Sequence, residues 1–65
     1  MAVITVLERM DFERVELTDQ TPSLSSFRAE KNGFYYEFEY THKTGVLRYR
    51  ETGSKYWRTF WKAGS

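Results

Sequence analysis

The sequence contains no cysteine and a single histidine, so it has neither a disulfide nor the thiolate and imidazole set of a zinc finger. It has no run of about 18 apolar residues, the length that a membrane-spanning helix requires. The N-terminus lacks a basic segment ahead of its short apolar stretch, which Glu8 ends, so we expect no signal peptide. Neither sign of charge is in clear excess, because ten Lys and Arg residues against nine Asp and Glu residues leave a net charge of +1. These absences favour a cytoplasmic protein with no metal, no cofactor and no membrane partner.

The length of 65 residues allows one small domain. A chain of this size buries only about 60% of the surface that its unfolded form exposes, so we expect marginal stability. Turn-forming residues and the sole proline, Pro22, concentrate between Thr18 and Ser26. We therefore expect a single domain over 1–65, with an N-terminal element at 1–18, a loop at 19–26, a four-stranded antiparallel meander at 27–62 and a frayed tail at 62–65.

Aromatic residues make up 18% of the chain, and ten of the twelve lie between Phe34 and Trp61. Charge is uneven as well, since residues 1–30 carry six acids and three bases whereas residues 31–65 carry seven bases and three acids. By charge alone, this asymmetry points to an anionic partner for the C-terminal half.

Three turns organise the expected meander. Asn32-Gly33 is the favoured centre of a two-residue hairpin because both positions need positive φ. Residues 42–45 form a longer turn, and Gly53-Ser54 suits a type II′ turn with glycine at the first central position. The resulting pairs are Phe27–Phe38, Ala29–Tyr36, Arg28–Glu37, Tyr40–Leu47, Phe38–Tyr49, Glu39–Arg48, Glu37–Arg50, Leu47–Phe60, Tyr49–Arg58, Arg50–Trp57 and Val46–Trp61. Because opposite charges face each other across the strands, they help to specify the register.

This register separates two faces of the sheet. The expected core face holds Phe27, Ala29, Phe34, Tyr36, Phe38, Tyr40, Leu47, Tyr49, Tyr56 and Phe60. The expected solvent face holds Arg28, Tyr35, Glu37, Glu39, Arg48, Arg50, Trp57, Thr59 and Trp61.

The N-terminal element must cover the core face. Residues 2–7 are β-branched and favour a strand, although their apolar spacing also fits one stripe of a helix. We prefer a strand at 2–8, a turn near Met10-Asp11 and a strand at 12–18, with Val15 and Leu17 inward. The fold class is then all-β, a small antiparallel meander of five to six short strands, barrel-like and about the size of an SH3 domain. The alternative is an α+β fold with an N-terminal helix on a four-stranded sheet.

Groups suited to catalysis are scarce. His42 falls in an expected turn without an orienting acid or a nucleophile, so we interpret it as a solvent-exposed turn residue. Glu37 and Glu39 share one face at a spacing that suits a metal or an acid–base pair, but their arginine neighbours favour a structural salt ladder. The four glycines lie at turns or in the tail and form no phosphate-binding loop. We therefore expect no enzyme.

Large aromatic side chains on the solvent face allow two interpretations. In the first, Arg48 and Arg50 lie over the indoles, or the N-terminal element covers this side. In the second, the face binds a partner, because rings among Arg and Lys side chains occur both in single-strand nucleic-acid platforms and in protein hot spots. The partner-binding candidates are Trp57, Trp61, Tyr35, Arg48, Arg50, Lys55, Arg58 and Lys62.

The segment 31–45, with Asn32-Gly33-Phe34-Tyr35 and a Thr44-Gly45 turn, resembles the N-terminal arm-binding domain of tyrosine recombinases. That family has an Asn-Gly-Tyr-Tyr hairpin followed by a Thr-Gly turn, and the resemblance implies a three-stranded sheet that enters the major groove of DNA. The chain departs from this pattern, because it lacks the basic run after the turn and carries Glu37 and Glu39 on the reading face. No clear helix follows the sheet.

Two functions follow from these observations. The first is a non-catalytic protein-binding module or regulator that acts through the aromatic and arginine face, of the kind found in accessory, inhibitor or phage proteins. The alternative is a nucleic-acid-binding β domain that uses the basic, aromatic C-terminal hairpin. A homodimer is a further expectation, because exposed sheet edges and tryptophans can be buried against a second copy.

Overall fold

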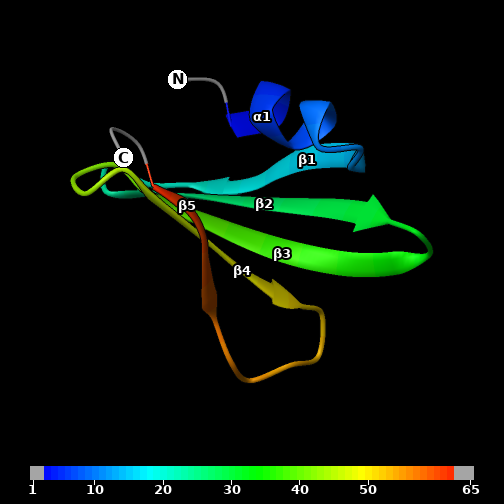
Figure 1. The fold of residues 1–65 in the computed structure, drawn as a ribbon. Coiled ribbons are helices and arrows are strands. Elements are labelled where there is room, and N and C mark those ends of the chain that lie inside the picture. Colours follow the sequence, from blue (N-terminus) through cyan, green and yellow to red (C-terminus); the bar gives the residue numbers. More distant parts are fainter. Residues whose placement is uncertain (1–2, 63–65) are drawn as a thin grey trace.

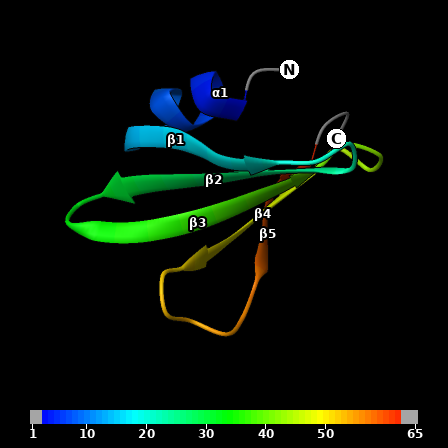
Figure 2. The same cartoon turned by 180° about the vertical axis from the view of Figure 1, so that it is seen from behind.

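The computed structural model describes residues 3–62 as one antiparallel sheet with a short helix beside it (Figure 1). The elements in chain order are α1 (Val3–Arg9), β1 (Glu13–Gln20), β2 (Leu24–Lys31), β3 (Phe34–Thr41), β4 (Val46–Glu51) and β5 (Arg58–Lys62). Each strand pairs with the next along the chain, so the expected antiparallel meander is confirmed and has five strands (Figure 2). Within the described residues β1 and β5 are the outer strands and are not paired with each other, so barrel-like closure stays a prediction.

The expected strand at 2–8 is wrong, because residues 3–9 form α1, as in the alternative interpretation; residue 2 lies outside the described residues. Val3 and Leu7 lie one helical turn apart and are 5% and 0% exposed. A strand would have placed Thr5 on the same face as these two residues, whereas the helix turns Thr5 to solvent. Packing of the apolar helix stripe therefore overrides the strand propensity of the β-branched side chains.

α1 ends in a Schellman motif. The amide of Phe12 donates to the carbonyl of Leu7, and the amide of Asp11 donates to the carbonyl of Glu8, each with an N···O distance of 3.1 Å. Asp11 takes the left-handed position of the motif, with φ of 68°. The expected turn near Met10-Asp11 is thus confirmed, although it leads from a helix into β1.

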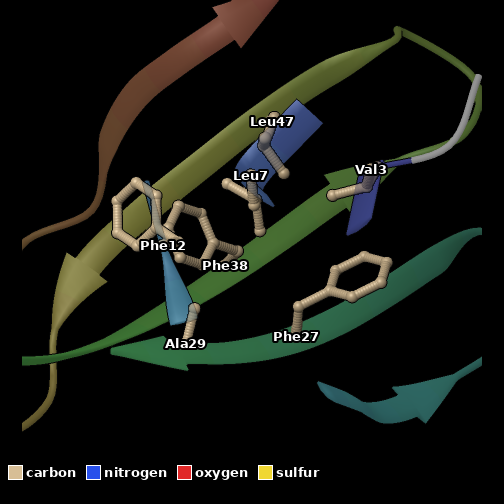
Figure 3. Close-up of a cluster of buried hydrophobic side chains, with 7 residues drawn as sticks. All are labelled: Val3, Leu7, Phe12, Phe27, Ala29, Phe38 and Leu47. Carbon is tan, nitrogen blue, oxygen red and sulfur yellow. The ribbon is translucent and has the colours of Figure 1, made fainter. Parts of the chain in front are cut away.

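The core lies between α1 and the sheet (Figure 3). Its buried members are Val3, Leu7, Phe12, Phe27, Ala29, Phe38 and Leu47. Phe12 packs edge-on against Phe38 and Phe60, with ring centroids 5.2 and 5.9 Å apart. Through these contacts Phe12 links the segment after the helix to β3 and β5. Such aromatic pairs contribute about 0.5–1.5 kcal/mol beyond their burial.

The registers that pair β2 with β3 and β3 with β4 are those expected from the sequence. Arg28 lies opposite Glu37, Phe38 lies opposite Tyr49, and the other expected pairs between β2, β3 and β4 are also present. The expected loop at 19–26 is too long, because β1 continues to Gln20 and β2 begins at Leu24. Thr21 closes this shorter connection, since its Oγ1 accepts the amide of Leu24 at 3.0 Å.

The connection between β4 and β5 differs from the expected tight turn. The amide of Ser54 donates to the carbonyl of Glu51 at 2.9 Å, and Gly53 has φ of 94°. Glycine therefore occupies the second rather than the first central position of the turn. Because β5 begins only at Arg58, the rest of the connection is a loop that contains Trp57.

A β-bulge shifts the pairing at the far end of β5. Tyr49 lies opposite Arg58 as expected, but Leu47 lies opposite Trp61 instead of Phe60, and Val46 lies opposite Lys62 instead of Trp61. The register shift lies between Leu47 and Arg48, where a bulge accommodates one extra residue of β5. Lys62 belongs to β5, while residues 63–65 of the expected frayed tail lie outside the described residues.

The assignment of the core face is correct in the middle of the strands and wrong at their ends. Phe34 and Tyr56 are 54% and 76% exposed. Phe34 is the first residue of β3, next to the hairpin turn, and Tyr56 lies in the loop before β5. Val15 packs against the core as expected, whereas Leu17 is 47% exposed at the outer strand β1.

Candidate binding surface

The sheet face opposite α1 carries a row of charged side chains that crosses neighbouring strands. This surface, named the polar face below, consists of Glu16, Arg28, Tyr35, Glu37, Glu39, Arg48, Arg50 and Thr59, with Trp57 at its border. The register places Glu16 opposite Arg28, Arg28 opposite Glu37, and Glu37 opposite Arg50. Acidic and basic side chains therefore alternate across four neighbouring strands.

Two ion pairs occupy this row. Arg28 binds Glu16 on β1, and Arg50 binds Glu37 on β3. The Nε of Arg50 donates to Oε1 of Glu37 at 2.8 Å, and Nη2 lies 2.7 Å from the same oxygen. The expected salt ladder is thus present, with Arg28 bonded to β1 instead of to Glu37. Each partly exposed pair is worth about 0–1 kcal/mol, so the ladder fixes side-chain positions more than it stabilises the fold.

Trp57 lies beneath two of these arginines. The guanidinium carbon of Arg50 is 4.6 Å from the centroid of the Trp57 ring, and that of Arg48 is 5.6 Å from it. These are the cation–π contacts of the first interpretation, and each contributes about 0.5–1 kcal/mol at an exposed site. The indole remains half-buried rather than buried, so part of it is open to a partner.

A hollow of about 290 Å³ lies beside this cluster. Trp57 and Arg50 line it on one side and Thr18 of β1 on the other, while Glu37 and Glu39 of β3 lie between them. A hollow that combines an indole, two guanidiniums (Arg28 and Arg50) and two carboxylates offers apolar contact together with hydrogen-bonding groups of both signs.

Trp61 does not belong to this surface, which corrects the expected placement. It is half-buried and packs against the core together with Phe60. The β-bulge opposite Leu47 and Arg48 explains this position, because one extra residue shifts the alternation of side chains along β5. The expectation that both tryptophans lie on the solvent face of the sheet is therefore wrong.

The remaining candidates do not line the hollow beside Trp57. Tyr35 is 54% exposed and lines a separate hollow of about 360 Å³ with Arg28, while Arg58 lies opposite the core-side Tyr49. Lys55 is exposed in the loop before β5, and Lys62 is exposed at the end of that strand. The structure thus gathers Trp57, Arg48 and Arg50 from the predicted set.

The sequence interpretation missed a hydrogen bond between Ser25 and His42. The Nε2 of His42 lies 2.7 Å from Oγ of Ser25, which is only 5% exposed, and the His42 ring packs edge-on against Tyr40. His42 is exposed as expected, but it is more than a free turn residue, because it partners a buried hydroxyl. The confirmed register could have indicated this contact, since Ser25 lies opposite Tyr40, two residues before His42.

Within residues 3–62 no group of three or more His, Asp and Glu side chains is placed to hold a metal ion. The same part of the chain contains no helix with the length and apolar character needed to cross a membrane. In comparisons with known proteins, the sequence matches no family model, no curated protein and no solved structure.

Proposed function

We propose that this protein is a non-catalytic binding module whose polar face, with Trp57 at its border, docks a partner protein. The observation that carries the proposal is the cluster of one half-buried indole and two guanidiniums on a surface that is otherwise polar. Tryptophan and arginine are enriched among the residues that dominate protein–protein binding energies, where they fill well-packed pockets from which water is excluded. A chain without cysteine suits the reducing cytoplasm, where we place this interaction.

Charge balance favours a protein over a nucleic acid as the partner. A phosphate-binding surface needs unpaired positive charge, yet Arg50 is bound to Glu37, and Glu39 lines the same hollow. A partner surface with charges of both signs complements the alternating row better than a polyanion does. The arginine positions that Glu37 and Trp57 fix also reduce the side-chain ordering that binding costs.

A second candidate function rests on the loop between β4 and β5. Tyr56 is 76% exposed there, with Lys55 directly before it and Arg58 two residues after it. An exposed ring flanked by two basic residues is suited to stacking on an unpaired nucleobase. Nucleic-acid binding through this loop is therefore the alternative. It predicts an affinity that falls steeply as salt rises, because bound phosphates release counterions.

Affinity capture with matched variants tests the proposal. The immobilised protein is incubated with extract of its source cells, with and without nuclease, and is compared with Trp57→Ala and Tyr56→Ala variants of confirmed fold. The proposal predicts a protein that is retained after nuclease treatment, retained by Tyr56→Ala and lost with Trp57→Ala. Material that nuclease removes and that Tyr56→Ala loses would instead support the alternative.

A further inference from the structure

An apolar hollow lies between α1 and the outer part of the sheet. It has a volume of about 210 Å³ and is lined by Val3, Ile4, Leu17, Gln20, Ser25 and Phe27. Ile4 and Leu17 are 37% and 47% exposed, although most apolar side chains of α1 and β2 in this region are buried. At about 30 Å³ per water, the hollow has the volume of about seven water molecules, which gives room for one side chain.

The most exposed large hydrophobic side chain of the described residues lies elsewhere. Tyr56 is 76% exposed in the loop between β4 and β5, where Lys55 precedes it and Arg58 follows two residues later. Both views of the fold show α1 at one end of the molecule and this loop at the opposite end (Figures 1 and 2). The loop therefore cannot reach the apolar hollow of its own molecule. It can, however, enter the apolar hollow of a second copy.

The two regions have opposite charge. Apart from Glu16, which belongs to the polar face, residues 3–20 of α1 and β1 carry four acids and two bases, and residues 55–58 carry two bases and no acid. A loop that entered the hollow of another copy would bring Lys55 and Arg58 toward this acidic segment. Charge complementarity of this kind speeds association and fixes orientation more than it adds affinity.

We infer that the protein associates head to tail with further copies of itself, Tyr56 of one copy filling the apolar hollow between α1 and β1 of the next. The contact joins two different surfaces, so each copy keeps one free loop and one free hollow, and the assembly grows beyond a dimer. One loop in one hollow is a small interface, so association is weak and depends on concentration. This inference does not rest on the proposed function, because it uses neither Trp57 nor the hollow of the polar face.

Sedimentation of the wild-type protein gives the first test. The average mass is followed from about 10 µM to about 1 mM, the range in which small contacts associate, at low and at moderate salt. The inference predicts an average mass that rises past two copies and that falls when salt is added. A monomer throughout this range, or a species that stops at the dimer, would overturn it.

A mixing experiment with two variants tests the geometry. Tyr56→Ser removes the inserted side chain and keeps the hollow, while Leu17→Arg blocks the hollow and keeps Tyr56. Both positions are exposed, so circular dichroism is expected to show folded proteins. Each variant alone is expected to be monomeric, and an equimolar mixture is expected to form a one-to-one pair that grows no further.

Phe34→Ser is the matched control, because Phe34 is 54% exposed and belongs to neither surface. It is expected to associate as the wild type does. If Tyr56→Ser and Leu17→Arg each associate like the wild type, or if their mixture forms no pair, the head-to-tail contact is wrong.

Discussion

The guanidinium of Arg50 lies 4.6 Å from the centre of the Trp57 ring and is held there by two contacts to Glu37. One residue of β4 thus connects a loop residue to the carboxylate of a neighbouring strand. Because the loop before β5 has no strand pairing at Trp57, this contact and that of Arg48 are what position the indole on the polar face. The position of Trp57 on the polar face therefore depends on cation–π contacts as much as on the sheet.

Replacing Arg50 by alanine removes both the ion pair and the closer cation–π contact. We expect a loss of about 0.5–1.5 kcal/mol in the free energy of unfolding, measured by urea denaturation. Arg28→Ala is the matched control, because Arg28 has one exposed ion pair and no ring contact, and about 0–0.5 kcal/mol is expected. Equal losses in the two variants would show that the Trp57 contact contributes nothing.

The two tryptophans are expected to differ in fluorescence. In a Trp57→Phe variant only Trp61 reports, and its contact with the core predicts blue-shifted emission with slow quenching by acrylamide. In a Trp61→Phe variant only Trp57 reports, and its place on the polar face predicts emission at longer wavelength with faster quenching. The reverse order would contradict the bulge in β5 and the packing of Trp61.

Substitutions of two leucines, one buried and one exposed, test the packing of α1 against the core. Leu7 of α1 is 0% exposed against the core, so Leu7→Ala is expected to cost about 2–5 kcal/mol. Leu17 is 47% exposed, so Leu17→Ala is expected to cost less than about 1 kcal/mol. Thermal unfolding with a circular dichroism check compares the two, and a larger loss at Leu17 would contradict the helix packing.

The hydrogen bond between Ser25 and His42 is suited to a double-mutant cycle. His42→Ala leaves the buried Ser25 hydroxyl without its partner and is expected to cost about 1–3 kcal/mol. Ser25→Ala removes the polar group itself, so adding His42→Ala to it is expected to cost less than it does alone. Urea denaturation of the four proteins gives the coupling energy, and a value near zero would show that the bond is not formed in solution.

The middle of the fold follows from local chemistry and could be predicted. Asn32-Gly33 has the positive φ values that the two-residue hairpin requires, and the alternation of aromatic and acidic residues along β3 then sets both neighbouring registers. The pairing of Arg50 with Glu37 was predictable for the same reason. The β3–β4 register places the two residues opposite each other, and opposite charges favour such a cross-strand pair.

The ends of the fold depend on contacts that a local pattern does not contain. Residues 3–9 carry signals for strand and helix, and only packing of Leu7 against the sheet decides between them. The bulge that turns Trp61 to the core is likewise a tertiary effect, because neither glycine nor proline marks it in β5. The sequence therefore predicted two tryptophans on the solvent face, of which the structure places Trp61 against the core.

The most direct test of a protein-binding polar face is site-specific photo-crosslinking. A photoreactive amino acid replaces Thr59, which lies exposed opposite Arg48 on the polar face, or Lys43, which lies exposed in the turn after β3. In extract of the source cells, the account predicts a protein adduct from position 59 that survives nuclease and is absent from position 43. Equal adducts from both positions, or an adduct that nuclease removes, would contradict it.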